Sequence, residues 1–199
     1  MTTVLFGGAF DPPQNAHVAL VREARGRFEP ERLVVLVVAE PGHKEVVLSA
    51  QTRLDLARAA FPGDEVVLDG HARTADLLRE GRYADPLFVI GADEFCDFLQ
   101  WKEPDTVLEL ARLGVATRPG FPRERLDRVL ERLARPERVE FFTIEPLDVS
   151  SSEVRRRVAL GEPYAELVPA AVAELIRRRG LYRSEGYTTA GTPQEDGTA

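Results

Sequence analysis

Short apolar runs alternate with amphipathic segments along most of this chain. Segments typical of strands lie at 3–7, 32–39, 65–69, 86–91, 113–117 and 138–144. Segments with apolar residues at helical spacing lie between them, at 15–28, 49–61, 74–81 and 122–134. Because several strands are apolar without interruption, we expect them to be buried on both faces. The pattern predicts an α/β fold: a doubly wound, Rossmann-like parallel sheet that binds ligands beyond the carboxyl ends of its strands.

The alternation stops after Ile144. Segments 150–161 and 169–180 indicate two closing helices with no strand between them, and Gly161 and Gly180 are expected to end them. From residue 184 the chain has almost no apolar content and is rich in Gly, Thr and acidic residues. We therefore predict a single domain over 1–183 and a disordered tail over 184–199.

The amino-acid composition of the chain restricts the classes of function that it can have. With 199 residues, 44% hydrophobic and 30% charged, the chain is long enough to bury one core. A net charge of −7 argues against binding of nucleic acid or an anionic membrane, but a small phosphorylated substrate remains compatible. A single cysteine, no leader segment and no apolar run near the about 18 residues of a membrane span predict a cytoplasmic protein. The oligomeric state is left open, and a homo-oligomer is compatible with the sequence.

The first strand ends in the stretch GGAFDPPQNAH. Gly7 and Gly8 would let backbone N–H groups approach an anion closely, and the following helix would direct its positive end at the same place. Asn15 is expected to cap that helix, and His17 lies in its first turn, where an imidazole can face a phosphate. The competing interpretation is a tight strand-to-helix turn with a surface histidine.

A second candidate anion site precedes the first closing helix. Ser150, Ser151 and Ser152 offer hydroxyl and backbone donors at the helix start, and Arg155 lies about one turn further on. Taken alone, a serine cluster in this position is more often an ordinary helix cap. Beside the glycine loop, the phosphate interpretation is favoured.

The glycine loop resembles nucleotidyltransferases with an HxGH motif, in particular the bacterial nicotinate-nucleotide adenylyltransferase family, whose motif reads roughly GGxFDPxHxGH. Gln14 stands where the first motif histidine would be, and Ala16 stands where its glycine would be. Residues 88–120, the segment DVSSSEVRRRV and the closing GLYR are also similar to the family. The resemblance covers nearly all of residues 1–183. The motif positions that match are Gly7, Gly8, Phe10, Asp11, Pro12 and His17.

The resemblance implies an adenylyltransferase that transfers AMP from ATP to nicotinate mononucleotide and releases pyrophosphate, a step of NAD biosynthesis. It implies that Mg²⁺ is bound through the ATP phosphates, with no protein metal site. It implies catalytic roles for His17, Gln14 and Arg155. Residues expected at ATP are Gly7, Gly8, Phe10, Lys44, Gly91, Asp93, Ser150, Ser151 and Ser152. Residues expected at the mononucleotide are Arg73, Thr74, Trp101, Lys102 and Arg118.

Two of these residues have a structural alternative. Asp93 follows a strand and Gly91, so it is placed either to accept hydrogen bonds from ribose hydroxyls, as in the family, or to cap a helix. Trp101 is the only tryptophan, and in the family an aromatic here stacks on the pyridine ring. A lone tryptophan is otherwise more often part of the core.

Three departures from the family leave alternatives open. Gln14 keeps a hydrogen-bond donor but gives up positive charge, which predicts a slower catalyst, or else a nucleotide-binding protein without catalysis. Arg73 replaces a tyrosine, and the loop at His43 and Lys44 is short, which leaves room for another phosphorylated acceptor. A dinucleotide-binding oxidoreductase is disfavoured, because the first loop lacks the third glycine of GxGxxG.

Overall fold

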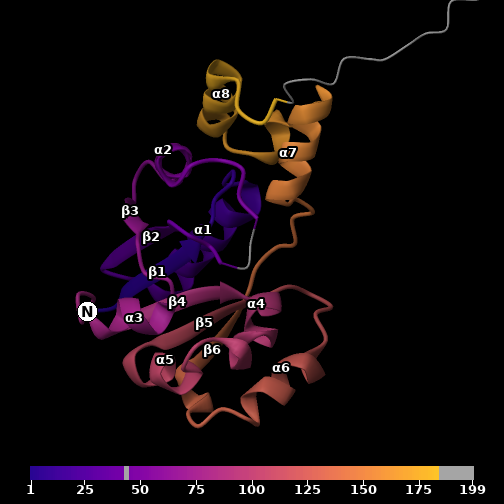
Figure 1. The fold of residues 1–199 in the computed structure, drawn as a ribbon. Helices are drawn as coiled ribbons and strands as arrows, with labels where there is room; N and C mark the ends of the chain where they lie inside the picture. Colours follow the sequence, from indigo (N-terminus) through magenta and orange to yellow (C-terminus); the bar gives the residue numbers. More distant parts are fainter. Residues whose placement is uncertain (43–44, 184–199) are drawn as a thin grey trace, which may run out of the picture.

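Six parallel strands form one sheet in the computed structural model, which describes residues 1–42 and 45–183 (Figure 1). The strand order is β3-β2-β1-β4-β5-β6, so the predicted doubly wound fold is confirmed. Lys44, His43 and the predicted tail 184–199 lie outside the described residues. The strands are β1 (Thr3–Gly8), β2 (Arg32–Val38), β3 (Glu65–Asp69), β4 (Pro86–Gly91), β5 (Arg112–Thr117) and β6 (Val139–Thr143).

Helices connect the strands and close the chain. The α-helices are α1 (Asn15–Phe28), α2 (Ala50–Ala60), α3 (Thr74–Arg79), α4 (Ala92–Cys96), α5 (Pro104–Leu110), α6 (Arg123–Leu130), α7 (Ser151–Leu160) and α8 (Ala170–Arg179). Short 3-10 helices are η1 (Phe98–Gln100), η2 (Pro136–Arg138) and η3 (Ala165–Leu167). The pattern of apolar residues did not predict α4 and α5, which have 5 and 7 residues, although it predicted α3, which has 6.

The sheet separates two apolar layers. Along β1, Val4 and Phe6 belong to one core cluster and Leu5 to the other, since successive side chains of a strand point to opposite faces. Helices α1, α2, α7 and α8 supply the first cluster, and α3 to α6 supply the second. Figure 1 shows these two groups of helices on opposite sides of the sheet. Both faces of the central strands are therefore buried, as their uninterrupted apolar runs predicted.

The ends of α7 and α8 agree with the sequence, whereas α6 ends at Leu130, four residues before the predicted end, and the predicted cap of α1 is wrong. Ser49 caps α2, accepting a hydrogen bond from the Thr52 N–H, and Gly161 and Gly180 end α7 and α8 in the left-handed conformation. The prediction that Asn15 caps α1 is wrong: the cap is Gln14, and the Asn15 amide donates to the Glu166 carbonyl oxygen at 2.8 Å. Residue 15 therefore joins the start of α1 to η3.

The closing helices fold back onto the first half of the chain. Val154 of α7 and Ile176 of α8 are buried in the same cluster as Phe10 and Leu54. This packing places the start of α7 beside the loop that follows β1. Strand order reverses between β1 and β4, and in sheets of this kind the ligand crevice lies outside the carboxyl ends of such strands.

None of the helices in the two described stretches combines the length and the apolar character needed to cross a membrane.

Candidate active site

The two glycines at the end of β1 leave room for aromatic rings. A Cβ on Gly8 would lie 2.9 Å from Cζ of Phe10, and a Cβ on Gly7 would lie 3.0 Å from Cζ of Phe88. Phe10 itself is 1% exposed and has a φ of +51°, a conformation that is strained for a bulky residue and is found mostly at functional sites. Ring packing therefore requires glycine at both positions. Because neither glycine has a side chain, neither one covers the backbone at the start of the loop.

Gln14 and His17 cap the start of α1 reciprocally. The side-chain oxygen of Gln14 accepts from the N–H groups of Ala16 and His17, the latter at 3.3 Å. In return, Nδ1 of His17 accepts from the Gln14 backbone N–H at 3.1 Å. Because Nδ1 is an acceptor, a neutral His17 ring carries its proton on Nε2. The pair forms a capping box in which glutamine and histidine take the usual places of serine and glutamate.

The glycine loop and the serine cluster meet in space. The Ser151 hydroxyl donates to the Pro12 carbonyl oxygen at 2.7 Å, across 139 positions of sequence. Nη1 of Arg155 donates to the Asp11 carbonyl oxygen at 2.7 Å, and its Nη2 donates to the Ser152 hydroxyl at 3.3 Å. The two stretches predicted to bind anions are therefore in contact with each other.

The capping interpretation of the serine cluster is confirmed for one serine. The Ser150 hydroxyl accepts from the Glu153 N–H at 3.1 Å and caps α7, whereas the next two serines contact the glycine loop and Arg155. A cap and a binding role are compatible here, because α7 still presents its positive end beside the loop.

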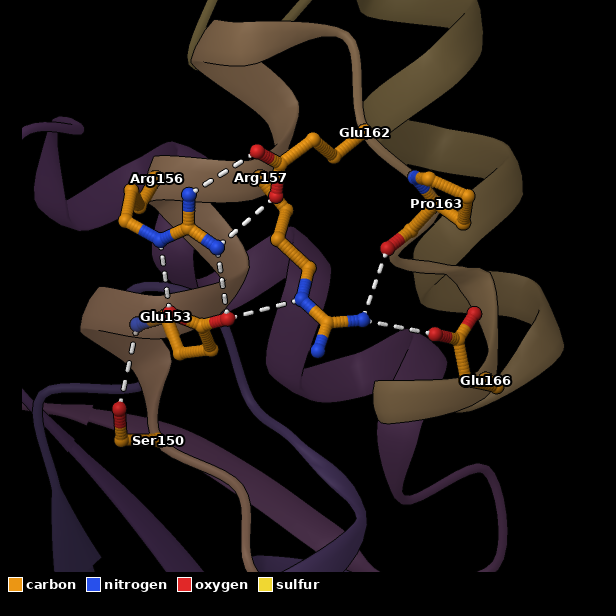
Figure 2. A network of polar contacts seen from close by, with 7 residues as sticks. All are labelled: Ser150, Glu153, Arg156, Arg157, Glu162, Pro163 and Glu166. Carbon is orange, nitrogen blue, oxygen red and sulfur yellow. Dashed lines mark hydrogen bonds and ion pairs between the residues drawn. The ribbon is translucent and has the colours of Figure 1, made fainter.

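An ion-pair network holds the start of α7 against η3 (Figure 2). Glu153 accepts from Nε of Arg156 at 2.9 Å and from Nε of Arg157 at 2.8 Å, and these hydrogen bonds lower its pKa to about 2. Nη1 of Arg157 also reaches Glu166 of η3 at 2.8 Å. Since the Glu166 carbonyl oxygen binds Asn15, the network ties α7, η3 and α1 together at the site.

Asp11 lies inside the loop and is only 2% exposed. One carboxylate oxygen accepts from the Val47 N–H, and the other accepts from the Tyr182 hydroxyl at 2.8 Å. Burial, together with the charge of Asp11, raises the pKa of the Tyr182 hydroxyl, which therefore stays protonated as a donor.

Arg53 of α2 is 1% exposed and was not anticipated from the sequence. Its guanidinium donates to the carbonyl oxygens of Ala9 at 2.7 Å, Val38 at 2.8 Å and Ala39 at 2.7 Å. Burial lowers its pKa, while the charge of Asp11 raises it. The sequence signal for a buried Arg53 is its position in the helix. It lies one turn before Ala57, which is buried, and therefore on the apolar stripe of α2.

At the carboxyl end of β4, Asp93 lies between two arginines. Nη2 of Arg118 is 3.7 Å and Nη1 of Arg125 is 3.8 Å from its carboxylate oxygens. Asp93 does not cap α4: the cap position is Gly91, and no side chain hydrogen-bonds there, so the capping interpretation is wrong. A Cβ on Gly91 would meet open space. The exposed Asp93 carboxylate is accessible at the carboxyl end of β4.

Trp101 is partly core and partly surface. Its ring lies edge-on to Phe98 at 5.2 Å and to Phe88 at 6.2 Å between centroids, and it packs against the second core cluster. Phe88 in turn lies against Gly7, so one ring joins Trp101 to the glycine loop.

The remaining residues predicted at the mononucleotide surround α3. Nζ of Lys102 lies 3.4 Å from the Asp76 carboxylate of that helix. Arg73 is at the start of α3 and donates to the Ala72 carbonyl oxygen at 3.0 Å, and Thr74 is the first helical residue. The structure therefore brings Lys102 beside α3 but does not test binding by any of these residues.

Comparison with known proteins identifies the family of the chain. A sequence model of cytidylyltransferase-like proteins matches residues 5–157, and the chain belongs to that family of nucleotidyltransferases. A probable nicotinate-nucleotide adenylyltransferase of Rubrobacter xylanophilus is 34% identical over 206 residues, covering 96% of this chain and 96% of the relative. A probable nicotinate-nucleotide adenylyltransferase of Thermus thermophilus is 34% identical over 191 residues, covering 90% of this chain and 98% of the relative.

The fold is also found among solved structures. The Plasmodium falciparum nicotinic acid mononucleotide adenylyltransferase complexed with NaAD superposes with a TM-score of 0.71 and 17% identity. The match covers 91% of this chain and 97% of that one. At this identity the likeness concerns the fold.

Proposed function

We propose that this chain is a nicotinate-nucleotide adenylyltransferase, which joins AMP from ATP to nicotinate mononucleotide and releases pyrophosphate. One observation carries the proposal: the contacts of Ser151 and Arg155 with the Asp11–Pro12 backbone, which unite two anion-binding stretches into one site. Near-full-length relatives with this name support it.

The reaction requires positioning more than covalent help from the protein. A phosphate oxygen of the mononucleotide attacks the α-phosphorus of ATP, the bond from that phosphorus to the bridging oxygen breaks, and pyrophosphate leaves with the electron pair. Negative charge spreads over the α-phosphate as this happens. We assign its stabilisation to Nε2–H of His17 and to the guanidinium of Arg155, which are preorganised by their contacts with Gln14 and Asp11.

Gln14 contributes chiefly through its shape and through the amide nitrogen of its side chain. Its oxygen is engaged by the helix N–H groups, which leaves its amide nitrogen as the group that can donate to a phosphate. That donor is neutral, so we expect a slower catalyst than one with a cationic group in this place.

Mg²⁺ is expected to arrive bound to ATP and to offset the charge of the leaving pyrophosphate. The protein groups fit such an arrangement, since both carboxylate oxygens of Asp11, the acid within the glycine loop, already accept hydrogen bonds from Val47 and Tyr182. In the part of the chain that the structure describes, no three His, Cys, Asp or Glu side chains gather as a metal-ligating group.

The nucleosides are assigned to the β4 and β5 side. We propose that Asp93 accepts from the ribose hydroxyls of ATP beside Gly91, and that Trp101 stacks on the pyridine ring. Arg118, Lys102 and Thr74 complete the mononucleotide side. Arg73, in place of the family's tyrosine, is the observation that favours a related acceptor as the second candidate, because a charged guanidinium does not make the same contacts as a phenol ring. A cytoplasmic location stays a prediction.

To test this proposal, purified protein is incubated with ATP, Mg²⁺ and a panel of mononucleotides that includes the nicotinate and nicotinamide forms. The products are identified by their mass. We expect the acid form to give the dinucleotide, and His17→Ala to abolish transfer. Arg22→Ala, on the exposed face of α1, should keep full activity.

Other outcomes are equally informative. Product from a different phosphorylated acceptor would support the second candidate. Calorimetric binding of ATP without turnover on any mononucleotide would contradict the enzyme and favour a nucleotide-binding protein. Full activity in His17→Ala would remove that residue from the site.

A further inference from the structure

Tyr182 lies near the end of the described chain yet contacts its beginning. Its hydroxyl donates to Asp11 at 2.8 Å, across 171 positions of sequence. The side chain is held in place by its neighbours: Leu181 and Tyr182 pack against the first core cluster, and the Leu181 N–H donates to the Ile176 carbonyl oxygen at 3.1 Å. The contact is therefore set by the way α8 ends.

Asp11 is a junction of four segments. Its side chain accepts from Val47, which precedes α2, and from Tyr182, which follows α8. Its carbonyl oxygen accepts from Arg155 of α7, and the buried charge of Arg53 lies nearby in α2. Gln14 and His17 follow Asp11 by three and six positions, so the loop that Asp11 anchors leads directly into the start of α1.

We propose that Tyr182 is a positioning residue for the transfer reaction, holding Asp11 so that the loop presents Gln14 and His17 beside Arg155. The inference rests on the proposed function. It assigns a role in turnover to the end of the domain, which is distant in sequence from every group that touches the substrates.

The expected effect of removing the Tyr182 hydroxyl follows from the hydrogen bonds of the Asp11 carboxylate. Without the hydroxyl, one oxygen of a charged group that is 2% exposed loses its donor, and the loop must shift to recruit water or another N–H group. Donors that stabilise the transition state act only when they are held in place, so a looser loop lowers kcat. None of the contacts of Asp11 described above involves Asp93 or Trp101, so KM should change little.

Tyr182→Phe is the central variant, since it removes one oxygen atom and keeps the ring in the core. Its matched control is Tyr164→Phe, whose hydroxyl donates to the Ala173 carbonyl oxygen at 3.5 Å between η3 and α8. We expect Tyr182→Phe to lower kcat about tenfold and to change either KM by less than about twofold, with Tyr164→Phe near wild type.

A double-mutant cycle shows whether Tyr182 acts through Asp11. Asp11→Asn keeps the shape of the side chain but replaces one acceptor by a donor. If the two residues act as one unit, the double variant should lose little more kcat than Asp11→Asn alone. Additive losses, an unchanged kcat in Tyr182→Phe, or equal losses in both tyrosine variants would overturn the proposal.

Amide hydrogen exchange separates this inference from the proposed function. Exchange in a peptide covering residues 9–17 should be severalfold faster in Tyr182→Phe than in wild type or Tyr164→Phe. Absence of turnover in wild type would count against the proposed function, and exchange would still test the contact. Unchanged exchange in Tyr182→Phe would refute the role of Tyr182 in holding the loop.

Discussion

At the scale of single residues, the contacts of Gln14 explain how the loop keeps its structure without the first motif histidine. The side chain is 7% exposed, and its oxygen reaches back to two N–H groups at the start of α1. An imidazole that is protonated on both nitrogens has no acceptor and cannot form the same cap. The glutamine therefore supports the helix that carries His17 while leaving a neutral donor at the site.

The substitution Gln14→His tests whether Gln14 supports the helix cap at the expense of a charged donor. We expect turnover to rise by about tenfold, because a cationic donor stabilises the developing charge better than an amide. We also expect the free energy of unfolding to fall by about 1 kcal/mol, because the cap of α1 is lost. Pyrophosphate release and urea denaturation measure the two effects. Gln14→Ala should be the slowest of the three proteins, and an unchanged or lower rate in Gln14→His would contradict the assignment.

At the scale of elements, the turn between β3 and α3 carries a histidine, His71, that lies between two carboxylates. Nδ1 of His71 lies 2.6 Å from the Asp69 carboxylate, and Nε2 lies 3.0 Å from Glu80. Hydrogen bonding to Asp69 and then to Glu80 raises the pKa of His71, against the effect of burial. The protonated ring therefore joins the end of β3 to the end of α3.

The sign of the pH effect follows from that shift. Because the folded pKa lies above the unfolded value of about 6.5, the stabilisation is complete below that pH and is lost as pH rises through the folded value. Wild type should therefore melt at a higher temperature than His71→Gln at pH 5, and the difference should shrink as the pH rises above the ordinary histidine range. A difference that stays constant between these values would show that the two contacts do not depend on protonation.

At the scale of the whole molecule, the two ends of the domain form one site, so ligand binding should stabilise the entire fold. ATP with Mg²⁺ at about 100 times its Kd should add roughly 2.7 kcal/mol and raise the melting temperature by roughly 5–10 °C. Arg155→Ala should reduce this shift. Arg177→Ala, an exposed arginine paired with Glu174 on α8, should keep it. An equal shift in all three proteins would place the ATP phosphates away from α7.

Much of the architecture could be predicted because it depends on local periodicity. Segment 15–28 is a helix over the expected residues, and β3 and β4 have the expected bounds. The short α4 and α5 were missed, since their stability comes from packing against neighbouring strands rather than from an amphipathic period. The assignment of the cap to Asn15 failed because Gln14 is long enough to fold back, which no propensity scale anticipates.

Motif spacing in the sequence was sufficient to single out Gly7–Gly8, His17 and Ser150–Arg155 as candidate phosphate-binding groups, because short-range chemistry depends on neighbours in the chain, and phosphate binding by them stays a prediction. Tertiary structure alone decided that Arg53 would bind four carbonyl oxygens, those of Ala9, Val38, Ala39 and Leu48, and that Tyr182 would contact Asp11. Apart from the contact with Leu48, those contacts join residues that are distant in the chain, and they exist only because α2 and α8 pack on the same face of the sheet. Which polar groups meet in a buried space is a property of that packing, and local sequence carries no record of it.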